Sequence, residues 1–440
     1  MKFLDGIKLK TSTRQLVLGG LLFALAVLCF AAFFNTNLVF SLVEKSFGRN
    51  LNSEKWIPFL KTILSGLAFL CLVSAFTAIF FKDIQTFYAE HNLSFYLIVI
   101  SLTGLLCRLP GISFESVDYT NCLKPWYESF KADRFGAFRN NIGDYTNMYK
   151  YIIFLITFLP IKAVYAYKLV SILFDFILAA SAGLLVYTLT DKNKFKASAA
   201  YSVIMLLPSI ILNSSVWAQC DSIYTSFILI SFYYLLKTGE QNRTEQNRSI
   251  IFFTIAFCFK LQAIFYLPVI IIAILKGRLK VKSLIFFPIV YILTNLPAIC
   301  LGVSPFYALI GAYIKQITGY SSLCLNCPNL YAFLPAAFDD KGLSKIGTFM
   351  TFGLCVISAM VLTRDKKDSE KNWLLYAYAY LLVIPFLLPH MHERYFYLAD
   401  SFAVITAFVF PCYAYIPLLS IAAVLPTQVG FLYGLNGSFN

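Results

Sequence analysis

The segment PHMHERYFYLAD (389–400) concentrates polar side chains between two long apolar runs. It holds two of the chain's three histidines, His390 and His392, followed directly by Glu393 and Arg394. A guanidinium binds phosphate oxygens through paired hydrogen bonds, and an imidazole can donate a further one. The segment therefore predicts an anion site in which Arg394 and His392 hold a phosphate, while His390 and Glu393 contact the attached sugar or the acceptor.

Two other interpretations of this segment stay open. An interfacial turn needs only an Arg–Glu pair and a belt of aromatic residues, and the segment supplies both. A metal site is less well supported, because two histidines this close in a turn lack the i, i+4 spacing of a helical zinc motif. The sequence thus indicates no metal site and no cofactor, although it leaves room for a divalent metal.

Lys260 and Gln262, in the segment FKLQ, interrupt the apolar run 249–275. A charge inside a membrane span is costly, so it marks a functional site by default. No acid lies within a helical turn of Lys260. Its ammonium therefore either reaches the interface along its alkyl stem or binds a phosphate. We predict two short helices that meet here, with Lys260 at the phosphate and Gln262 at the sugar or acceptor.

The segment WAQCDS (217–222) begins another apolar run. Asp221 is a favoured residue type for a helix N-cap. A cap accounts for Asp221 alone and leaves Trp217 and Gln219 unexplained. An indole can pack on the apolar face of a sugar while amide and carboxylate groups bind its hydroxyls. A helix cap and a sugar or acceptor site both stay open.

The polar segment 111–149 mixes acidic, basic and aromatic residues and closes with the turn IGDY. Mixed charge is normal for a solvated loop. An aspartate just beyond a helix end, as Asp118 is expected to be, can also act as a general base toward a hydroxyl. In that case Asp144 and Tyr145 of IGDY would bind the sugar or the acceptor.

Composition indicates one polytopic membrane domain. Hydrophobic residues make up 59% of the chain and charged residues 13%, against about 25% charged in soluble domains. Apolar runs predict an all-α membrane protein with about 11–13 transmembrane helices. The expected parts are N-terminal transmembrane helices (1–110), an extracytoplasmic catalytic loop (111–149) and a helical bundle (150–440) with an outward loop at 302–345.

The net charge of +14 does not indicate a nucleic-acid partner, because the basic residues cluster in short segments between apolar runs. Such clusters mark cytoplasmic loops; they occur at 192–196, 276–282 and 364–371. The basic N-terminus is expected to be cytoplasmic, which places the polar segments described above in the outer layer of the cell membrane. For CLNC (324–327), a disulfide or two free thiols is favoured over a zinc site, since no second Cys pair accompanies it.

Several motifs in consistent order carry a resemblance to a known family. The stretches PWYESF…IGDYTNMY, LNSSVWAQCDSIYT, FKLQAIF, PNLYAF and PHMHERYFYLAD resemble integral-membrane glycosyltransferases of the GT-C class. Within that class, they are similar to bacterial relatives of the second mannosyltransferase of GPI-anchor assembly. The resemblance covers residues 112–402.

This resemblance implies a GT-C-like fold and an inverting transfer of a sugar on the extracytoplasmic face. The donor would be a hexose, such as mannose, on a polyprenyl phosphate, and the acceptor a glycan or glycolipid. The position that matches the family's catalytic base is Asp118. Many members carry a pair of acids there, whereas Tyr119 follows Asp118 in this chain.

Two other functions would use similar residues. A polysaccharide polymerase or ligase applies the same chemistry to longer glycans. A flippase or transporter of lipid-linked sugars also needs basic residues in a membrane cavity. Its polar residues should be spread through the membrane depth, whereas the sequence predicts them in the outer layer.

Overall fold

The computed structural model describes residues 13–47, 53–79, 93–140, 142–238, 242–334, 340–364 and 369–433. These residues are mainly helical, and their only named strands, β1 (Cys324–Leu325) and β2 (Met391–His392), pair in parallel. By length and composition, 7 described helices can cross a membrane, or up to 8 if a bent pair counts as one span. An all-α polytopic membrane protein is thereby confirmed.

The helices vary widely in length. The helices that supply the membrane-length candidates are α1 (Thr13–Phe34), α3 (Ser53–Ile79), α5 (Leu93–Arg108), α8 (Ala163–Leu189), α14 (Phe286–Cys300), α16 (Lys341–Arg364) and α19 (Tyr415–Tyr433). The other helices are α2 (Thr36–Phe47), α6 (Lys124–Asp133), α7 (Asn147–Ile156), α9 (Lys194–Leu206), α10 (Pro208–Ile211), α11 (Asp221–Leu236), α12 (Arg243–Phe259), α13 (Leu267–Leu275), α15 (Ala312–Thr318), α17 (Glu370–Leu387) and α18 (Tyr397–Val409). Short 3₁₀ or π turns lie at Leu109–Gly111, Tyr119–Leu123, Gly136–Asn140, Leu212–Val216, Leu261–Tyr266, Val281–Ile285, Tyr307–Gly311, Leu330–Phe333 and Pro411–Tyr413.

Fewer helices reach membrane length than the 11–13 expected, because several apolar runs are broken. Pro208 lacks an amide hydrogen and disfavours a helical residue before it. Leu207 accordingly takes an extended conformation, and the pair formed by α9 and the segment 208–216 bends by 48°. Lys260 is extended as well, with φ −153°, and ends α12. The break predicted at FKLQ is confirmed.

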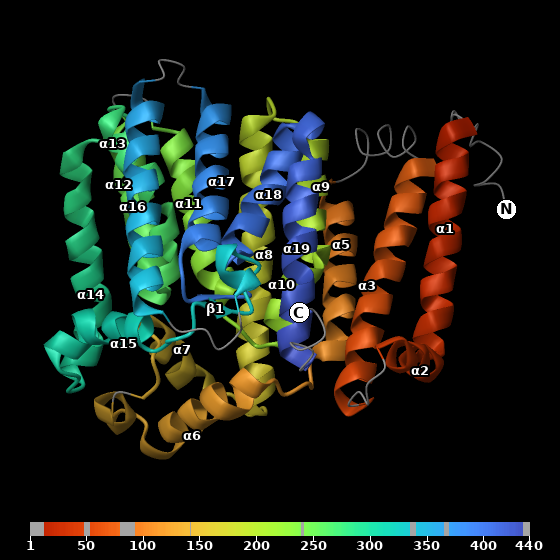
Figure 1. Ribbon diagram of the computed structural model, residues 1–440, viewed down its shortest axis with the longest axis horizontal. Helices are drawn as coiled ribbons and strands as arrows, with labels where there is room; N and C mark the ends of the chain where they lie inside the picture. The colour runs from red at the N-terminus through yellow and green to blue at the C-terminus, as the bar shows by residue number, and fades with distance from the viewer. Residues whose placement is uncertain are drawn as a thin grey trace.

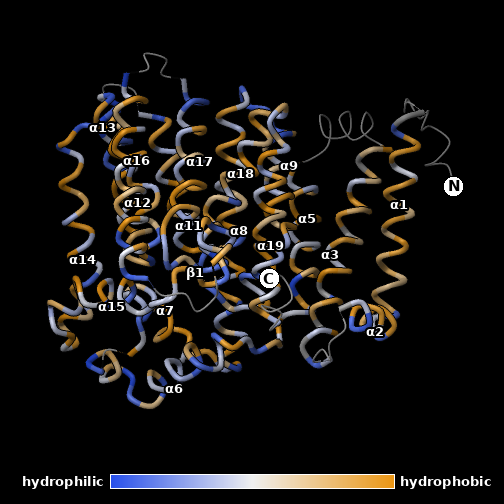
Figure 2. The backbone as a smooth tube through the Cα atoms, in the orientation of Figure 1, coloured by the Kyte–Doolittle hydropathy of each residue, from blue (hydrophilic) through white to orange (hydrophobic). Residues whose placement is uncertain are grey.

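The helices stand side by side, with α1 and α3 at one edge of the molecule and α14 at the other (Figure 1). Hydrophobic residues follow the helices along their length, and hydrophilic residues gather toward the two ends (Figure 2). The predicted loop 111–149 is largely helical, and α6 lies across the end of the bundle opposite the N-terminal end of α1 (Figure 1). The basic segment 1–12, on which the expected cytoplasmic N-terminus depends, lies outside the described residues.

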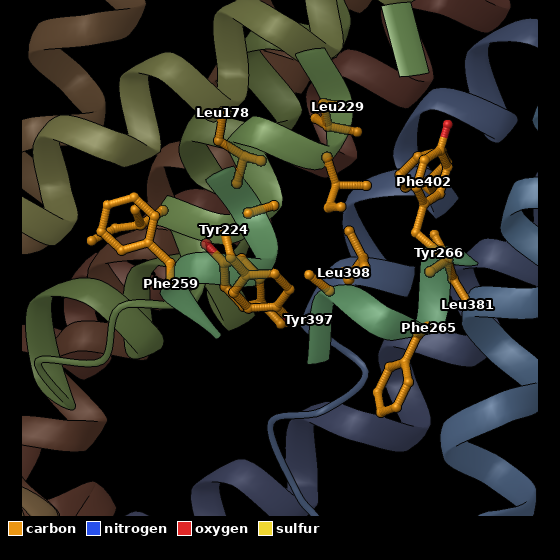
Figure 3. Close-up of a cluster of buried hydrophobic side chains, with 14 of the residues drawn as sticks. Leu178, Tyr224, Leu229, Phe259, Phe265, Tyr266, Leu381, Tyr397, Leu398 and Phe402 are labelled. Atoms are coloured by element: carbon orange, nitrogen blue, oxygen red, sulfur yellow. The ribbon is translucent and has the colours of Figure 1, made fainter. Parts of the chain in front are cut away.

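A buried apolar cluster joins the helices that carry the polar segments (Figure 3). Leu178 of α8 and Leu229 of α11 are fully buried. The cluster also contains aromatic side chains from α11, α12, α18 and the turn before α13: Tyr224, Phe259, Tyr266, Tyr397 and Phe402. Close packing of these rings fixes the relative position of the helix ends from which the polar segments emerge.

Gly347 of α16 provides a test of how the 324–333 segment is held. A Cβ at Gly347 would overlap the hydroxyl of Tyr331, which donates to the carbonyl of Leu387 at 3.0 Å. Gly347→Ala is therefore expected to lower the free energy of unfolding by about 1–3 kcal/mol, the usual cost of overpacking. Unfolding of the purified protein in detergent measures this.

The matched control lies on the same helix. A Cβ at Gly353 meets no atom within 4 Å, so Gly353→Ala should be neutral or stabilise by up to about 1 kcal/mol through helix propensity. Equal effects of the two substitutions would contradict the packing of Tyr331 against Gly347.

Candidate functional site

The carboxylate of Asp118 receives hydrogen bonds from two distant segments. Its Oδ2 accepts from Nε1 of Trp217 at 2.9 Å, Nε2 of Gln219 at 2.8 Å and Nη1 of Arg394 at 3.2 Å. Its Oδ1 has no hydrogen-bond partner among the described residues, and the side chain is 23% exposed. A carboxylate held this way keeps one oxygen available to a ligand.

The backbone around Trp217 explains how two neighbouring side chains reach one oxygen. Ala218 has φ +66°, a conformation that non-glycine residues adopt rarely and at a cost. It turns the chain between Trp217 and Gln219. The hydroxyl of Ser116 donates to the carbonyl of Trp217 at 3.0 Å, and that of Ser171 donates to the carbonyl of Gln219 at 2.6 Å. These bonds stabilise the strained turn beside Asp118.

Lys260 pairs with an acid that lies 39 positions earlier in the chain. Its ammonium donates to Oδ1 of Asp221, while Nδ2 of Asn213 donates to Oδ2 of Asp221 at 2.8 Å. The ammonium also lies 5.8 Å from the ring centre of Tyr145 and 5.9 Å from that of Tyr224, within cation–π range. Both charged side chains are buried.

Arg394 connects the two acids. Its Nη1 contacts Asp118, and its Nε lies 4.0 Å from Oδ2 of Asp221. Its guanidinium also lies over the indole of Trp217, 5.4 Å from the ring centre. Nε is buried and donates no hydrogen bond within the described residues. Asp118, Asp221, Lys260 and Arg394 therefore form one charge network, drawn from four separate segments.

Glu393 and His392 border this network in the connection between α17 and α18. Burial raises the pKa of Glu393 to about 7, although the neighbouring Arg394, at 3.4 Å, favours the charged form. Burial, with the positive charges of Arg394 and Lys260, holds the pKa of His392 well below its usual value. His392 is thus neutral at pH 7, and its buried Nε2 has no partner within the described residues.

The pairing of β1 with β2 fixes the position of this segment. Leu325 stands opposite His392, and the amide of Glu393 donates to the carbonyl of Leu325 at 3.2 Å. His390 has φ +62°, and its ring nitrogens contact the carbonyl of Ser322 at 2.7 Å and the hydroxyl of Ser344 at 2.8 Å. His390 therefore anchors the segment to its neighbours, while Arg394 reaches the acids.

The remaining candidates lie around the network. The hydroxyl of Tyr145 donates to Oε1 of Gln219 at 3.0 Å, so it joins the Asp118 cluster directly. Asp144 is half-buried, and its backbone carbonyl accepts from Gln316 at 2.8 Å. Gln262 is buried two residues from Lys260, and its Oε1 has no partner in the described part of the chain. Their binding roles stay predictions.

The CLNC segment carries two free thiols in this structure. Sγ of Cys324 donates to the carbonyl of Cys327 at 3.3 Å. Within the described residues, no group of three or more His, Cys, Asp or Glu side chains is arranged to hold a metal ion.

Several charged residues inside the bundle were not predicted from the sequence. Arg108 donates to Oδ2 of Asp175 at 2.8 Å, and Ser214 donates to the same oxygen at 2.6 Å. Lys168 donates to the carbonyls of Gly111 and Phe114 from a fully buried position. Charged residues therefore also lie inside the bundle, apart from the polar segments singled out in the sequence. The signal was present, since Lys168 and Asp175 interrupt an apolar run of membrane length.

Comparison of the chain with protein-family models gives no match, and comparison with curated proteins gives no significant match.

The Lys260–Asp221 pair should behave as a buried ion pair. Lys260→Met leaves Asp221 buried without its partner, which typically costs about 3–5 kcal/mol. Adding Asp221→Asn to Lys260→Met removes that charge, so the double variant should recover much of the loss. A double-mutant cycle of unfolding free energies in detergent measures the coupling.

The control is an exposed pair on α12. Arg248 contacts Glu245 at 3.1 Å with half of its side chain exposed, so Arg248→Met should change the free energy of unfolding by less than about 1 kcal/mol. If the double variant were as unstable as the sum of its single variants, the two charges would not interact.

The raised pKa of Glu393 predicts a specific pH dependence. Between its ordinary value of 4.5 and about 7, the folded chain retains a proton on Glu393 that the unfolded chain loses. The free energy of unfolding should therefore fall as the pH rises through this window, and Glu393→Gln should remove that part of the fall. The neighbouring charged or titratable groups are Arg394, His392, Asp118, Asp221, Cys324, Cys327 and Tyr395.

Unfolding in detergent at pH 5 and pH 8 tests this on wild type and Glu393→Gln. The exposed Glu128 of α6 supplies the control, because Glu128→Gln should keep the wild-type difference. An unchanged difference in Glu393→Gln would contradict the assignment.

Proposed function

We propose that this chain is an integral-membrane glycosyltransferase that moves a hexose from a polyprenyl-phosphate donor to a hydroxyl of a glycan or glycolipid. The observation that carries the proposal is the contact of Arg394 with Asp118 at 3.2 Å inside one buried charge network. It combines a carboxylate suited to accept a proton with a guanidinium suited to bind a phosphate. The network also includes the indole of Trp217, which suits a sugar ring.

The proposed reaction is a single in-line displacement with inversion. The acceptor oxygen forms a bond to the anomeric carbon as the bond from that carbon to the phosphate oxygen breaks. The acceptor's proton passes to Asp118, and the electron pair of the broken bond stays on the departing lipid phosphate. Arg394 stabilises the phosphate as its charge increases, with Lys260 and neutral His392 nearby.

The hydrogen bonds of Asp118 suggest how donor binding would prepare the base. Arg394 is one of three hydrogen-bond donors to Oδ2 of Asp118. A phosphate that draws the guanidinium toward itself would remove one of these donors. In the proposed mechanism, Asp118 is then freer to accept the proton of the acceptor hydroxyl, and it becomes so only when the donor is present.

The finer architecture belongs to the same proposal. If the shorter helices also lie in the membrane, the count approaches the expected 11–13 membrane helices of a GT-C-like fold. The face that carries α6 would be extracytoplasmic, because it lies opposite the N-terminal end of α1 (Figure 1). A lipid-linked donor would then reach the network from the bilayer.

A transporter or flippase of lipid-linked sugars is the second candidate. The Arg108–Asp175 pair and the buried Asp400 place ionisable side chains within the bundle, and such residues mark ion and substrate pathways in transporters. A polymerase or ligase would use the same base and the same cation on a longer donor. The donor that binds, and whether transfer occurs, separates these possibilities.

A panel of polyprenyl-phosphate sugars tests the proposal on purified protein. One sugar should stabilise wild type and Asp118→Asn, by about 2.7 kcal/mol at a hundredfold excess over Kd, but should not stabilise Arg394→Ala. Asp118→Asn should lower the rate of transfer by about 10²–10⁴, as loss of a general base does. Thermal unfolding and transfer of labelled sugar measure the two effects.

Arg394→Lys and Arg248→Ala serve as controls. Arg394→Lys keeps the charge without the planar fork, so it should bind the donor more weakly than wild type. Arg248→Ala removes an exposed cation and should change neither binding nor transfer. Stabilisation by a lipid-linked oligosaccharide alone would favour the polymerase or ligase, and donor binding without transfer would favour the transporter.

A further inference from the structure

Lys150 of α7 carries a buried positive charge that the charge network does not use. Only 2% of the residue is exposed. Its ammonium lies over the ring of Tyr307, 5.2 Å from the ring centre, but within the described residues it donates no hydrogen bond and forms no ion pair. A ring face offsets only part of the hydration that burial removes. Lys150 therefore lacks the ionic partner that a buried lysine ordinarily has.

Lys315 of α15 brings a second positive charge to the same place. Its ammonium and the hydroxyl of Tyr307 both donate to the carbonyl of Gly143, at 3.1 Å and 3.3 Å. Lys315 is exposed, and this bond uses one of its three ammonium hydrogens. Asp144 is near enough to attract Lys150 but forms no ion pair with it. The two lysines repel each other, and a bound anion would relieve that repulsion.

A series of hydrogen bonds joins this pair of lysines to the charge network. Nε2 of Gln316, on α15, donates to the carbonyl of Asp144 at 2.8 Å. The next residue, Tyr145, donates to Gln219 at 3.0 Å, and Gln219 donates to Asp118 at 2.8 Å. The IGDY turn is therefore bonded to α15 on one side and, through one glutamine, to the proposed base on the other.

Trp126 of α6 packs against the same turn. Its indole approaches Gly143 so closely that a Cβ there would lie 2.6 Å from the ring, and Gly143 has φ +70°. The ring centres of Trp126 and Tyr145 are 5.3 Å apart in an edge-to-face arrangement. The indole is half-buried, so its free surface suits the apolar face of a sugar. The helices that carry these residues, α6, α7 and α15, lie at the same end of the bundle (Figure 1).

We propose that Lys150 and Lys315 bind an anionic group, a phosphate or a carboxylate, of the acceptor. This rests on the proposed function, in which Asp118 takes the proton of the acceptor hydroxyl. The anionic group would accept hydrogen bonds from both ammonium groups, while Trp126 packs on the sugar that carries it. The donor phosphate would stay at Arg394, so the two anions would occupy separate cationic sites.

Binding of soluble sugars to the full chain in detergent tests this site. The probes are a hexose 6-phosphate, a hexuronic acid and the neutral hexose, and thermal stabilisation of the protein measures each affinity. Wild type should prefer at least one anionic sugar over the neutral one by about tenfold, the worth of a charge-assisted hydrogen bond. Lys150→Met should abolish this preference, and Lys315→Met should reduce it about threefold, because Lys315 is exposed. The probe that binds more tightly identifies the anionic group.

Two comparisons keep the test decisive. Lys162→Met removes an exposed ammonium just before α8, and it should keep the wild-type preference. Without ligand, Lys150→Met should be at least as stable as wild type, because it removes a buried charge that has no ionic partner among the described residues. A clear loss of stability in Lys150→Met would assign the side chain a structural role and overturn the proposal.

Competition separates this site from the donor site and from the membrane. Saturating polyprenyl phosphate should leave the affinity for the anionic sugar within about twofold, as expected for independent sites. Displacement by polyprenyl phosphate would place both anions at Arg394 and overturn the proposal. Displacement by phosphatidylglycerol but not by phosphatidylcholine would assign the lysines to a lipid head group and overturn it as well.

The remaining outcomes distinguish failure of this site from failure of the proposed function. If wild type shows no preference for either anionic sugar but binds and transfers a polyprenyl-phosphate sugar, the acceptor site proposed here fails while the glycosyltransferase stands. If the anionic sugar binds through Lys150 but no polyprenyl-phosphate sugar binds, the proposed function fails. The assignment of the anion to an acceptor then fails with it.

Discussion

The burial of ion pairs from separate segments is the constraint on which the structure of this site depends. Lys260 and Asp221 are nearly inaccessible, and Arg394 is buried between Asp118 and Asp221. A buried charge that loses its partner costs about 3–5 kcal/mol. Four segments, which include the end of α12 and the connection from α17 to α18, therefore have to meet at one point, and each stabilises the position of the others.

The same constraint explains why the helices around the site are interrupted. A continuous helix satisfies its own backbone and presents only side chains, whereas Lys260 is extended and Ala218 and His390 have positive φ. Irregular backbone at membrane depth is tolerated where protein buries it or where it lines a cavity. Here the parallel pair β1–β2 and the bonds from Ser116 and Ser171 satisfy backbone groups of these segments, and α6 lies across this end of the bundle (Figure 1).

The sequence was sufficient to predict the membrane class, the helix break at FKLQ and the polar segments that form the site. Composition and periodicity are local signals, so they identified Lys260 and Asp221 separately but did not predict that the two pair across 39 positions. Fewer described helices than the expected 11–13 reach membrane length, because an apolar run does not reveal where its helix ends; α18, for example, has 13 residues. The Arg108–Asp175 pair was not predicted, because an isolated charge inside an apolar run does not indicate which distant residue pairs with it. Asp118 was identified as a candidate base, but its three hydrogen-bond donors depend on tertiary structure.

Under the proposed function, the charge balance of the network is matched to the reaction. Two acids, Asp118 and Asp221, face two cations, Lys260 and Arg394, while burial favours neutral Glu393 up to about pH 7. A phosphodiester donor adds one negative charge, and cleavage of its sugar bond adds a second to the departing phosphate. The proton taken by Asp118 removes one negative charge at the same step. Because Arg394 contacts Asp118 directly, negative charge would move from Asp118 to the departing phosphate while both stay beside the guanidinium. The net charge of the buried site would therefore stay constant during the reaction, and a change in net charge is most costly in such a site.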